Sequence, residues 1–166
     1  PAPHTPTQAA GYRIGETTAP LERYTDFIVT FLTVSASPVA VDGPYIGEEY
    51  YTFTALADRK FLVLTFKLRN VGIRPATTPL LAGIAVTDRG FEFPSWNPPV
   101  GIHSEEYSPR VATAEEVQAM PAGAASFVEL FPEQESDVDS LAFEIPADQQ
   151  AVSVNIGYVD KPLLLK

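Results

Sequence analysis

The sequence predicts an all-β protein, an immunoglobulin-like antiparallel β-sandwich with one short helix near residues 113–120. Turn-forming residues separate β-prone runs about every ten residues, and no helix alternates with strands as in a parallel βαβ fold. One run, residues 59–72, has a clear period of two. Its even positions are apolar (Leu62, Leu64, Phe66 and Leu68). Its later odd positions are polar (Thr65, Lys67 and Arg69). Such a strand places one face in a core and the other toward solvent or a partner subunit.

Length and composition suit a single domain with its own core. The chain has 166 residues, of which 45% are hydrophobic, so neither disorder nor a need for covalent cross-links is indicated. Its formal net charge is −10 and its 11 basic residues are scattered, which argues against nucleic-acid binding. The absence of cysteine excludes disulfides, thiolate catalysis and cysteine-ligated metals. No apolar run is long enough to span a bilayer, so we expect no membrane span.

The first 26 residues differ in composition from the rest of the chain. They contain four prolines with many threonines and alanines, and Tyr12 and Ile14 are the residues that could dock on a domain. We therefore expect residues 1–26 to be a proline-rich N-terminal arm or linker, and residues 27–166 to be the sandwich domain.

The first part of the expected domain contains three β-prone runs. Residues 27–34 are rich in β-branched and aromatic side chains, and both their odd and their even positions are apolar. This indicates a strand that is covered on both faces. Residues 51–55 alternate between apolar and threonine side chains and predict a short strand. A turn at residues 57–58 then leads into the strand at 59–72, which Asn70 and Gly72 end.

A hairpin and a long loop follow. Residues 80–87 and 91–93 are the two strands of the hairpin, joined by the turn residues Asp88-Arg89-Gly90. The next stretch, residues 94–112, is rich in proline and has no clear period. Long loops of this kind in compact domains tend to be functional or disordered.

One helix and three strands complete the chain. Thr113 and Glu116 have the spacing of a capping box, and Pro121 ends the helix after about two turns. Three closing strands are expected, at residues 125–131, 140–145 and 151–159, and the last two alternate in the same way as the strand at 59–72.

Three stretches resemble a known family. They are Lys60-Phe61-Leu62-Val63-Leu64 through Asn70-Val71-Gly72, the hairpin from Ile84 to Pro94, and Leu130-Phe131-Pro132 through Leu141-Ala142-Phe143-Glu144-Ile145-Pro146. Over about residues 27–159 the chain is similar to the uncharacterised Ig-like domain family of secreted and lipid-anchored bacterial and archaeal proteins. That family shares a superfamily with the mycobacterial secreted immunoprotective antigen.

The resemblance implies an Ig-like sandwich in the cell envelope or outside the cell, and it implies no catalytic residues. The chain departs from the family pattern at Glu133, where glycine is usual after the proline, and in residues 94–112, which form a longer stretch than usual.

Four acidic residues suggest a cation site. In an extended segment, a period of two places alternate side chains on one side, and Ca²⁺ prefers several oxygen ligands from a flexible loop. The candidate ligands are Glu133, Glu135, Asp137 and Asp139. The alternative is a solvated strand face or turn, since the spacing and central glycine of an EF-hand loop are absent.

Aromatic residues in the loops suggest a contact surface for a partner. Tyr45, Trp96 and Tyr107 are the candidates, because tyrosine and tryptophan combine apolar area with a polar group and are enriched in interfaces. The alternative is a loop that folds back so that Trp96, the single tryptophan, closes one end of the sandwich.

These observations predict a non-enzymatic extracellular module of a prokaryotic cell surface that interacts with protein, including copies of itself. Sheet edges accept a strand from a neighbour, so a filament is one version, with residues 1–26 or the end Pro162–Lys166 as the donated segment. A secreted domain that binds Ca²⁺ or a glycan is the alternative. We expect no catalytic residue and no cofactor other than this Ca²⁺, since the serines lack a nucleophile motif and His4 and His103 lie in the arm and a loop.

Overall fold

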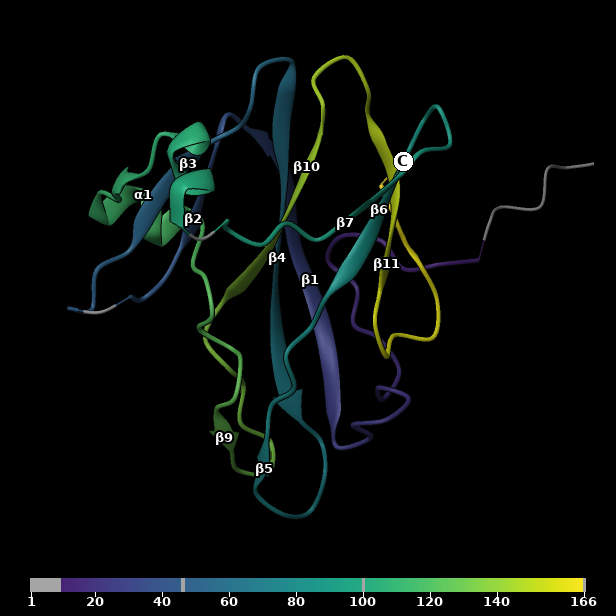
Figure 1. The fold of residues 1–166 in the computed structure, drawn as a ribbon. Helices are drawn as coiled ribbons and strands as arrows, with labels where there is room; N and C mark the ends of the chain where they lie inside the picture. Colours follow the sequence, from purple (N-terminus) through teal and green to yellow (C-terminus); the bar gives the residue numbers. More distant parts are fainter. Residues whose placement is uncertain (1–9, 46, 100, 166) are drawn as a thin grey trace, which may run out of the picture.

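Two antiparallel sheets form the body of the protein in a computed structural model, which describes residues 10–45, 47–99 and 101–165, with the side chains of 101–103 omitted (Figure 1). The first sheet has the strand order β1-β4-β10 and the second β12-β11-β6-β7. The first comprises β1 (Phe27–Ser37), β4 (Arg59–Asn70) and β10 (Asp139–Pro146). The second comprises β12 (Leu163–Leu164), β11 (Ala151–Ile156), β6 (Gly83–Thr87) and β7 (Glu92–Pro94).

The predicted all-β sandwich is thus confirmed, and the core lies between the two sheets. Phenylalanines of β1, β4 and β10 meet small and branched side chains of β6, β11 and β12 there. The fully enclosed members include Phe27, Val29, Phe31, Leu64, Ala85, Phe143, Ile145, Val154 and Leu163. Burial of this many apolar side chains is what offsets the conformational entropy of a chain without disulfides.

Strand β4 is buried on both faces over most of its length, which the sequence pattern shows only in part. Its even positions point into the core as expected, but Phe61 and Val63 on the other face are also buried, in a second cluster with Ala40. Thr65 was expected to face solvent or a partner, and this is wrong: it is 7% exposed and shares a hydrogen bond with Thr33 of β1. On this face the polar side chains that reach solvent therefore lie at the two ends of β4, with Arg59 at one end and Lys67 and Arg69 at the other.

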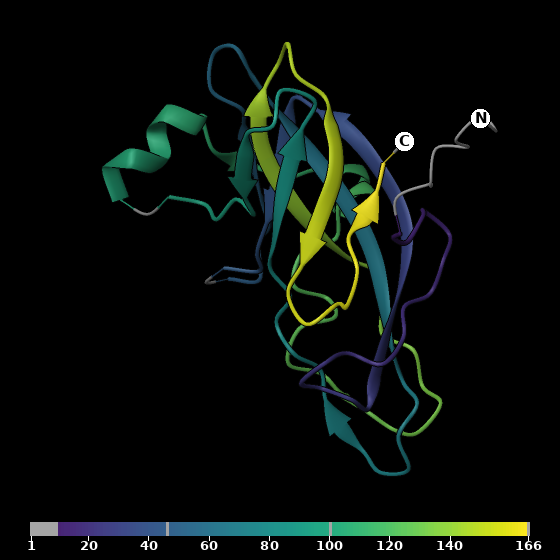
Figure 2. The ribbon, with the colours of Figure 1, turned by 90° about the vertical axis from the view of Figure 1, so that its right-hand side faces the viewer.

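Residues 10–26 pack along the sandwich and do not form a free linker. Tyr12 pairs with the β12 segment through a bond from its N–H to the Pro162 carbonyl, 2.9 Å long. Further along, the N–H groups of Gly15 and Thr18 donate to carbonyls of β1, each at 2.8 Å, and Leu21 is fully buried in the core. Figure 2 shows this segment running beside the edge of the sandwich. Residues 1–9 of the expected arm lie outside the described residues.

The C-terminal segment also pairs within its own chain. Leu163 and Leu164 form β12 beside Ser153 and Val154 of β11, and Leu163 is fully buried. The described part of the expected donor Pro162–Lys166 is therefore part of the second sheet, and Lys166 itself lies outside the described residues.

The predicted length of one closing strand is wrong. Residues 125–131 were expected to be a strand, but only β9 (Glu129–Leu130) is extended, paired with β5 (Ala76–Thr77). Phe127 has a positive φ of 56°, which breaks a strand. The cause is a tertiary contact: the side chain of Thr78 donates to the Ala125 carbonyl and accepts from the Val128 N–H, so the chain turns around it.

A side lobe stands beside the first sheet and consists of residues 38–57 and 95–124. It contains a small sheet, a 3₁₀ helix and an α-helix, and in Figure 2 part of it projects away from the sandwich. Its elements are β2 (Val39–Asp42), β3 (Tyr51–Thr54), β8 (Arg110–Val111), η1 (Gly101–Tyr107) and α1 (Ala114–Ala119). The expected long loop thus contains structure of its own.

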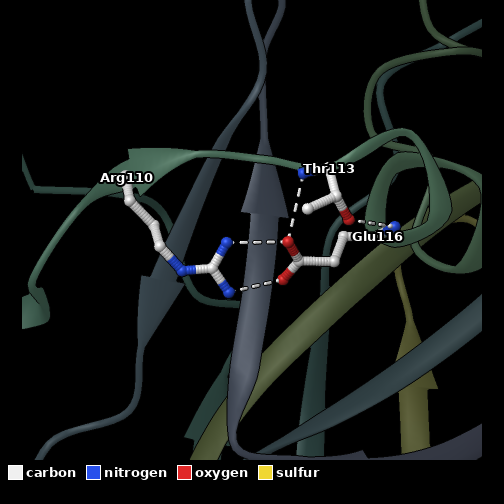
Figure 3. Close-up of polar contacts among 3 residues, drawn as sticks. All are labelled: Arg110, Thr113 and Glu116. Carbon is white, nitrogen blue, oxygen red and sulfur yellow. Dashed lines mark hydrogen bonds and ion pairs between the residues drawn. The ribbon is translucent and has the colours of Figure 1, made fainter.

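The predicted helix and its capping box are confirmed in α1 (Figure 3). The Thr113 hydroxyl accepts from the Glu116 N–H at 3.2 Å, and the Glu116 carboxylate accepts from the Thr113 N–H at 3.1 Å. Arg110 adds two hydrogen bonds to the same carboxylate, at 2.7 and 2.8 Å. These bonds hold the pKa of Glu116 down to about 2, the arginine contributing most. The helix buries no side chain, so local polar contacts define it.

Packing of residues 10–26 can be tested at Leu21. Truncation to alanine should lower the free energy of unfolding by about 2–5 kcal/mol, because a fully buried leucine leaves a cavity in the core. Urea unfolding would measure the change, with Ile14→Ala as the matched control, since Ile14 is 37% exposed and should cost much less. Equal and small losses for both variants would show that this segment is not part of the core.

Candidate functional site

Trp96 lies where the chain passes from the second sheet to the first. Pro94 ends β7, the Ser95 N–H donates to the Gly83 carbonyl of β6, and the Trp96 N–H donates to the Ala142 carbonyl of β10 at 2.7 Å. Residues 95–97 therefore close this side of the sandwich, as residues 12–21 close the other side.

The side chain of Trp96 joins three other rings. Its ring centre lies 4.9 Å from Phe61 of β4, 5.4 Å from Phe53 of β3 and 5.4 Å from Tyr107 of η1. Tilted and edge-to-face contacts at such distances are favourable beyond the area that they bury. The ring cluster therefore attaches the side lobe to the outer face of β4.

An open groove of about 450 Å³ adjoins this cluster. Its apolar lining comes from Leu56, Phe93, Pro94 and Trp96, and its polar lining from Arg59, Ser95, Asn97 and Glu144. We call this surface the Trp96 groove. Its volume lies within the range of about 300–1,000 Å³ that is usual for ligand sites.

The two charged side chains of the Trp96 groove are held by different contacts. The Arg59 guanidinium lies over the Phe93 ring, 5.8 Å from its centre. The carboxylate of Glu144 accepts from the Tyr107 hydroxyl at 3.1 Å and from the Leu56 N–H at 3.2 Å. Burial raises the pKa of Tyr107, and the charges of Glu144 and Glu106 raise it further against the lowering effect of Trp96. The phenol therefore stays a neutral donor to Glu144.

Chemically, the lining combines apolar surface with a few polar groups. The groove presents one carboxylate, one guanidinium, a serine, an amide and apolar surface, and no histidine or thiol lines it among the described residues. Nucleophilic catalysis needs a nucleophile activated by a nearby base, and this set does not provide such a pair. An apolar floor with a few polar groups is instead typical of recognition sites.

A smaller hollow of about 240 Å³ lies on the other side of residues 95–97 and contains Asp139. Asp139 is 4% exposed, and desolvation raises the pKa of its carboxyl. Hydrogen bonds from the N–H groups of Ser140, Ala125 and Gly123 and from the Ser126 hydroxyl oppose that rise. Four donors already occupy this carboxylate, so its role is to fix the backbone between the lobe and β10.

The structure brings two of the three predicted aromatic residues together. Trp96 and Tyr107 are in direct contact, whereas Tyr45 lies against Tyr51, 5.6 Å between ring centres, and donates its hydroxyl to Asp42. Burial and this bond raise the pKa of Tyr45. Trp96 is only half-buried, so it both anchors the lobe and lines the groove.

The four predicted cation ligands do not converge. Glu133 pairs with Arg69 at 2.7 Å and Glu135 with Lys67 at 3.8 Å, while Asp137 is exposed and Asp139 is buried. The segment departs from an extended strand, since Glu133 has a positive φ of 69°. Among the described residues, no group of three or more histidine, aspartate or glutamate side chains is placed to hold a metal ion. His4 and the His103 side chain lie outside the described part.

Of the residues that line the groove, the sequence analysis named only Trp96 as a site candidate, and it missed Leu56, Arg59 and Glu144 among the others. Glu144 does carry a signal, because Phe143 and Ile145 alternate with it and place it on the face of β10 away from the core. Nothing in the local sequence shows that this face meets Tyr107 and Leu56, which are far from it along the chain.

Comparison with known proteins shows the fold. The chain matches no known protein family by sequence, and no curated protein matches it either. A crystal structure of an uncharacterised β-sandwich protein from Clostridium difficile 630 is similar with a TM-score of 0.55 and 10% identity, over 98% of this chain and 97% of that one. MPT63, a secreted protein from Mycobacterium tuberculosis, is similar with a TM-score of 0.51 and 9% identity, over 96% of this chain and 99% of that one. The expected likeness to a secreted mycobacterial protein is confirmed for the fold.

The buried carboxyl of Asp139 predicts a pH dependence of stability. Its pKa is raised in the folded state, so between the unfolded and the folded pKa values the folded state binds more protons. The contribution of Asp139 to stability should therefore decrease as pH rises through that window. Urea unfolding at several pH values between about 3.5 and 6.5 should show the wild type losing stability relative to Asp139→Asn as pH rises. A relative gain would contradict the raised pKa.

Proposed function

We propose that the protein is a non-enzymatic extracellular module that binds a partner through the Trp96 groove. The observation that carries this proposal is the junction of lobe and sandwich, where four rings are packed and an open groove lies beside them. An interface needs a rigid apolar centre with satisfied polar groups at its rim. Trp96 and Phe93 supply the centre, and Glu144 and Arg59 supply the rim.

One observation supports an extracellular place at or near a prokaryotic cell surface: MPT63, a neighbour in fold, is described as secreted. Within the described residues, no helix is long and apolar enough to cross a membrane. We also propose that the chain belongs to the Ig-like family of secreted and lipid-anchored proteins.

Assembly into a filament by strand donation is a finer version with less support. Both candidate donors are used within their own chain, since Leu21 and Leu163 are fully buried. The outer edge of β7 carries a charged residue, Glu92, and a proline, Pro94, which lacks a donor for a new strand. Exchange between copies would require these segments to leave the core, so we favour binding through the groove.

Binding of Ca²⁺ can be decided by a thermal shift. A ligand that binds only the folded protein must raise its midpoint temperature. Because Glu133 and Glu135 already have cationic partners and Asp139 is enclosed by donors, we expect no difference between millimolar Ca²⁺ and EDTA. If Ca²⁺ raised the midpoint temperature by several degrees and the Asp137→Asn variant lost this rise, the result would support the cation site.

Site-specific photo-crosslinking tests the proposed binding surface. A photoreactive amino acid at Leu56 or Asn97 in the groove should form adducts with envelope or culture-medium proteins of the source cells. The matched control position is Asn155, which is exposed on β11 in the second sheet. Adducts that form equally from Asn155, or from no groove position, would contradict a binding role for this surface.

A further inference from the structure

We propose that one end of the sandwich holds a second binding site, for a fatty acid whose carboxylate pairs with Lys60 and whose alkyl chain lies between the two sheets. The site is separate from the Trp96 groove, and the inference does not rest on the proposed function. The observation that carries it is a half-buried lysine without an anionic partner beside an apolar hollow at the end of the core.

A hollow of about 250 Å³ lies at the end of the sandwich where β10 turns into β11, at the top of Figure 1. We call it the Lys60 hollow. Strands of both sheets contribute its apolar lining, which consists of Val34, Ala36, Leu62, Ile145, Ala151 and Leu165. Leu62 and Ile145 belong to the core cluster, and Val34, Ala151 and Leu165 pack against it. Protein cores are normally packed without such gaps, so the hollow extends the core toward solvent.

Lys60 occupies a core-facing position of β4. Side chains alternate along a strand, so Lys60 shares its face with Leu62 and Leu64. Its direct neighbour across the strand pair is Ile145 of β10, which is fully buried. Arg59, one residue earlier, lies on the opposite face and lines the Trp96 groove. The two adjacent cations of β4 therefore serve two different surfaces.

The charge of Lys60 is not balanced by an acidic side chain. Lys60 is half-buried, yet it takes part in no ion pair among the described residues, whereas Lys67 and Arg69 of the same strand each pair with a glutamate. Among the described residues that line the hollow, none is acidic. A charge that is partly withdrawn from water is stabilised by an opposite charge, so the Lys60 hollow favours an anion.

A fatty acid matches both properties of the hollow. Its carboxylate supplies the anion, and its chain covers the apolar lining. Gln150, which is exposed and also lines the hollow, offers a side-chain amide as a second donor to the carboxylate. The volume is about eight times the ~30 Å³ that one water occupies in the liquid, and a methylene group has a similar size, so we expect a chain of about eight carbons. An inorganic anion would leave the apolar lining uncovered, and a neutral alkane would leave Lys60 without a partner.

Isothermal titration calorimetry of the intact protein with sodium octanoate tests the site. Octanoate should bind saturably at one site, with an affinity that falls as NaCl is raised. Three matched ligands separate charge from chain: octan-1-ol lacks the charge, octylammonium reverses it and acetate lacks the chain. Each should bind at least about tenfold more weakly than octanoate. No octanoate binding, or equal binding of octan-1-ol or octylammonium, would overturn the inference.

A lysine variant tests the carboxylate contact. Lys60→Met keeps the aliphatic stem and removes the charge, so it should weaken octanoate binding about tenfold and leave octan-1-ol binding unchanged. Lys161→Met is the matched control, since Lys161 is exposed, lies outside the hollow and carries the same charge. Equal losses in the two variants would reduce the effect to net charge and overturn the inference.

Two variants that fill the hollow test the position of the chain. Ala151→Leu and Ala36→Leu add apolar volume to the lining, so each should weaken the binding of octanoate and of octan-1-ol. Ala36 is exposed, so its replacement should fold even if the half-buried position 151 does not accept leucine. Unchanged octanoate binding in a folded filling variant would contradict the site. A loss of binding in Arg59→Met but not in Lys60→Met would place octanoate in the Trp96 groove and overturn the inference as well.

Discussion

Burial of β4 on both faces is the constraint on which the rest of the structure depends. Its even-numbered side chains form the core between the two sheets, and Phe61 and Val63 on the opposite face require a cover of their own. The side lobe supplies that cover through Ala40, Trp96 and Tyr107. The lobe is therefore a second layer on the sandwich, and the Trp96 groove lies where this layer meets β7, β10 and the start of β4.

The sandwich has few free edges, and this shapes what it can bind. Residues 12–21 bond to both β12 and β1, and residues 95–97 join β6 to β10 on the opposite side. Unpaired strand edges are the usual route to aggregation and strand exchange, and here the chain covers them itself. Recognition through side chains in a groove is consistent with such a closed framework, whereas recognition through a strand edge would need the framework to open.

Two carboxyls at the lobe junction illustrate how buried polar groups define a position. Asp139 accepts from backbone groups of residues 123 and 125, and Glu144 accepts from Leu56 and Tyr107. Each satisfies donors that would otherwise be buried without a partner, so each fixes lobe segments against β10. Asp139 was a candidate cation ligand together with Glu133, Glu135 and Asp137. Its separate burial shows why acidic spacing alone is a weak signal, since the segment turns at Glu133 and loses its period of two.

The sequence by itself determined what depends on neighbours along the chain. The period of two in β4, β10 and β11, the turn before β7 and the capping box of α1 are local patterns, and all are present in the structure. Tertiary contacts decided the rest. The packing of residues 10–26, the shortening of the strand near Phe127 and the meeting of Trp96 with Glu144 and Arg59 depend on residues distant in the chain. Their partners are set by how the layers stack, and periodicity carries no information about which face of one strand meets which loop of another.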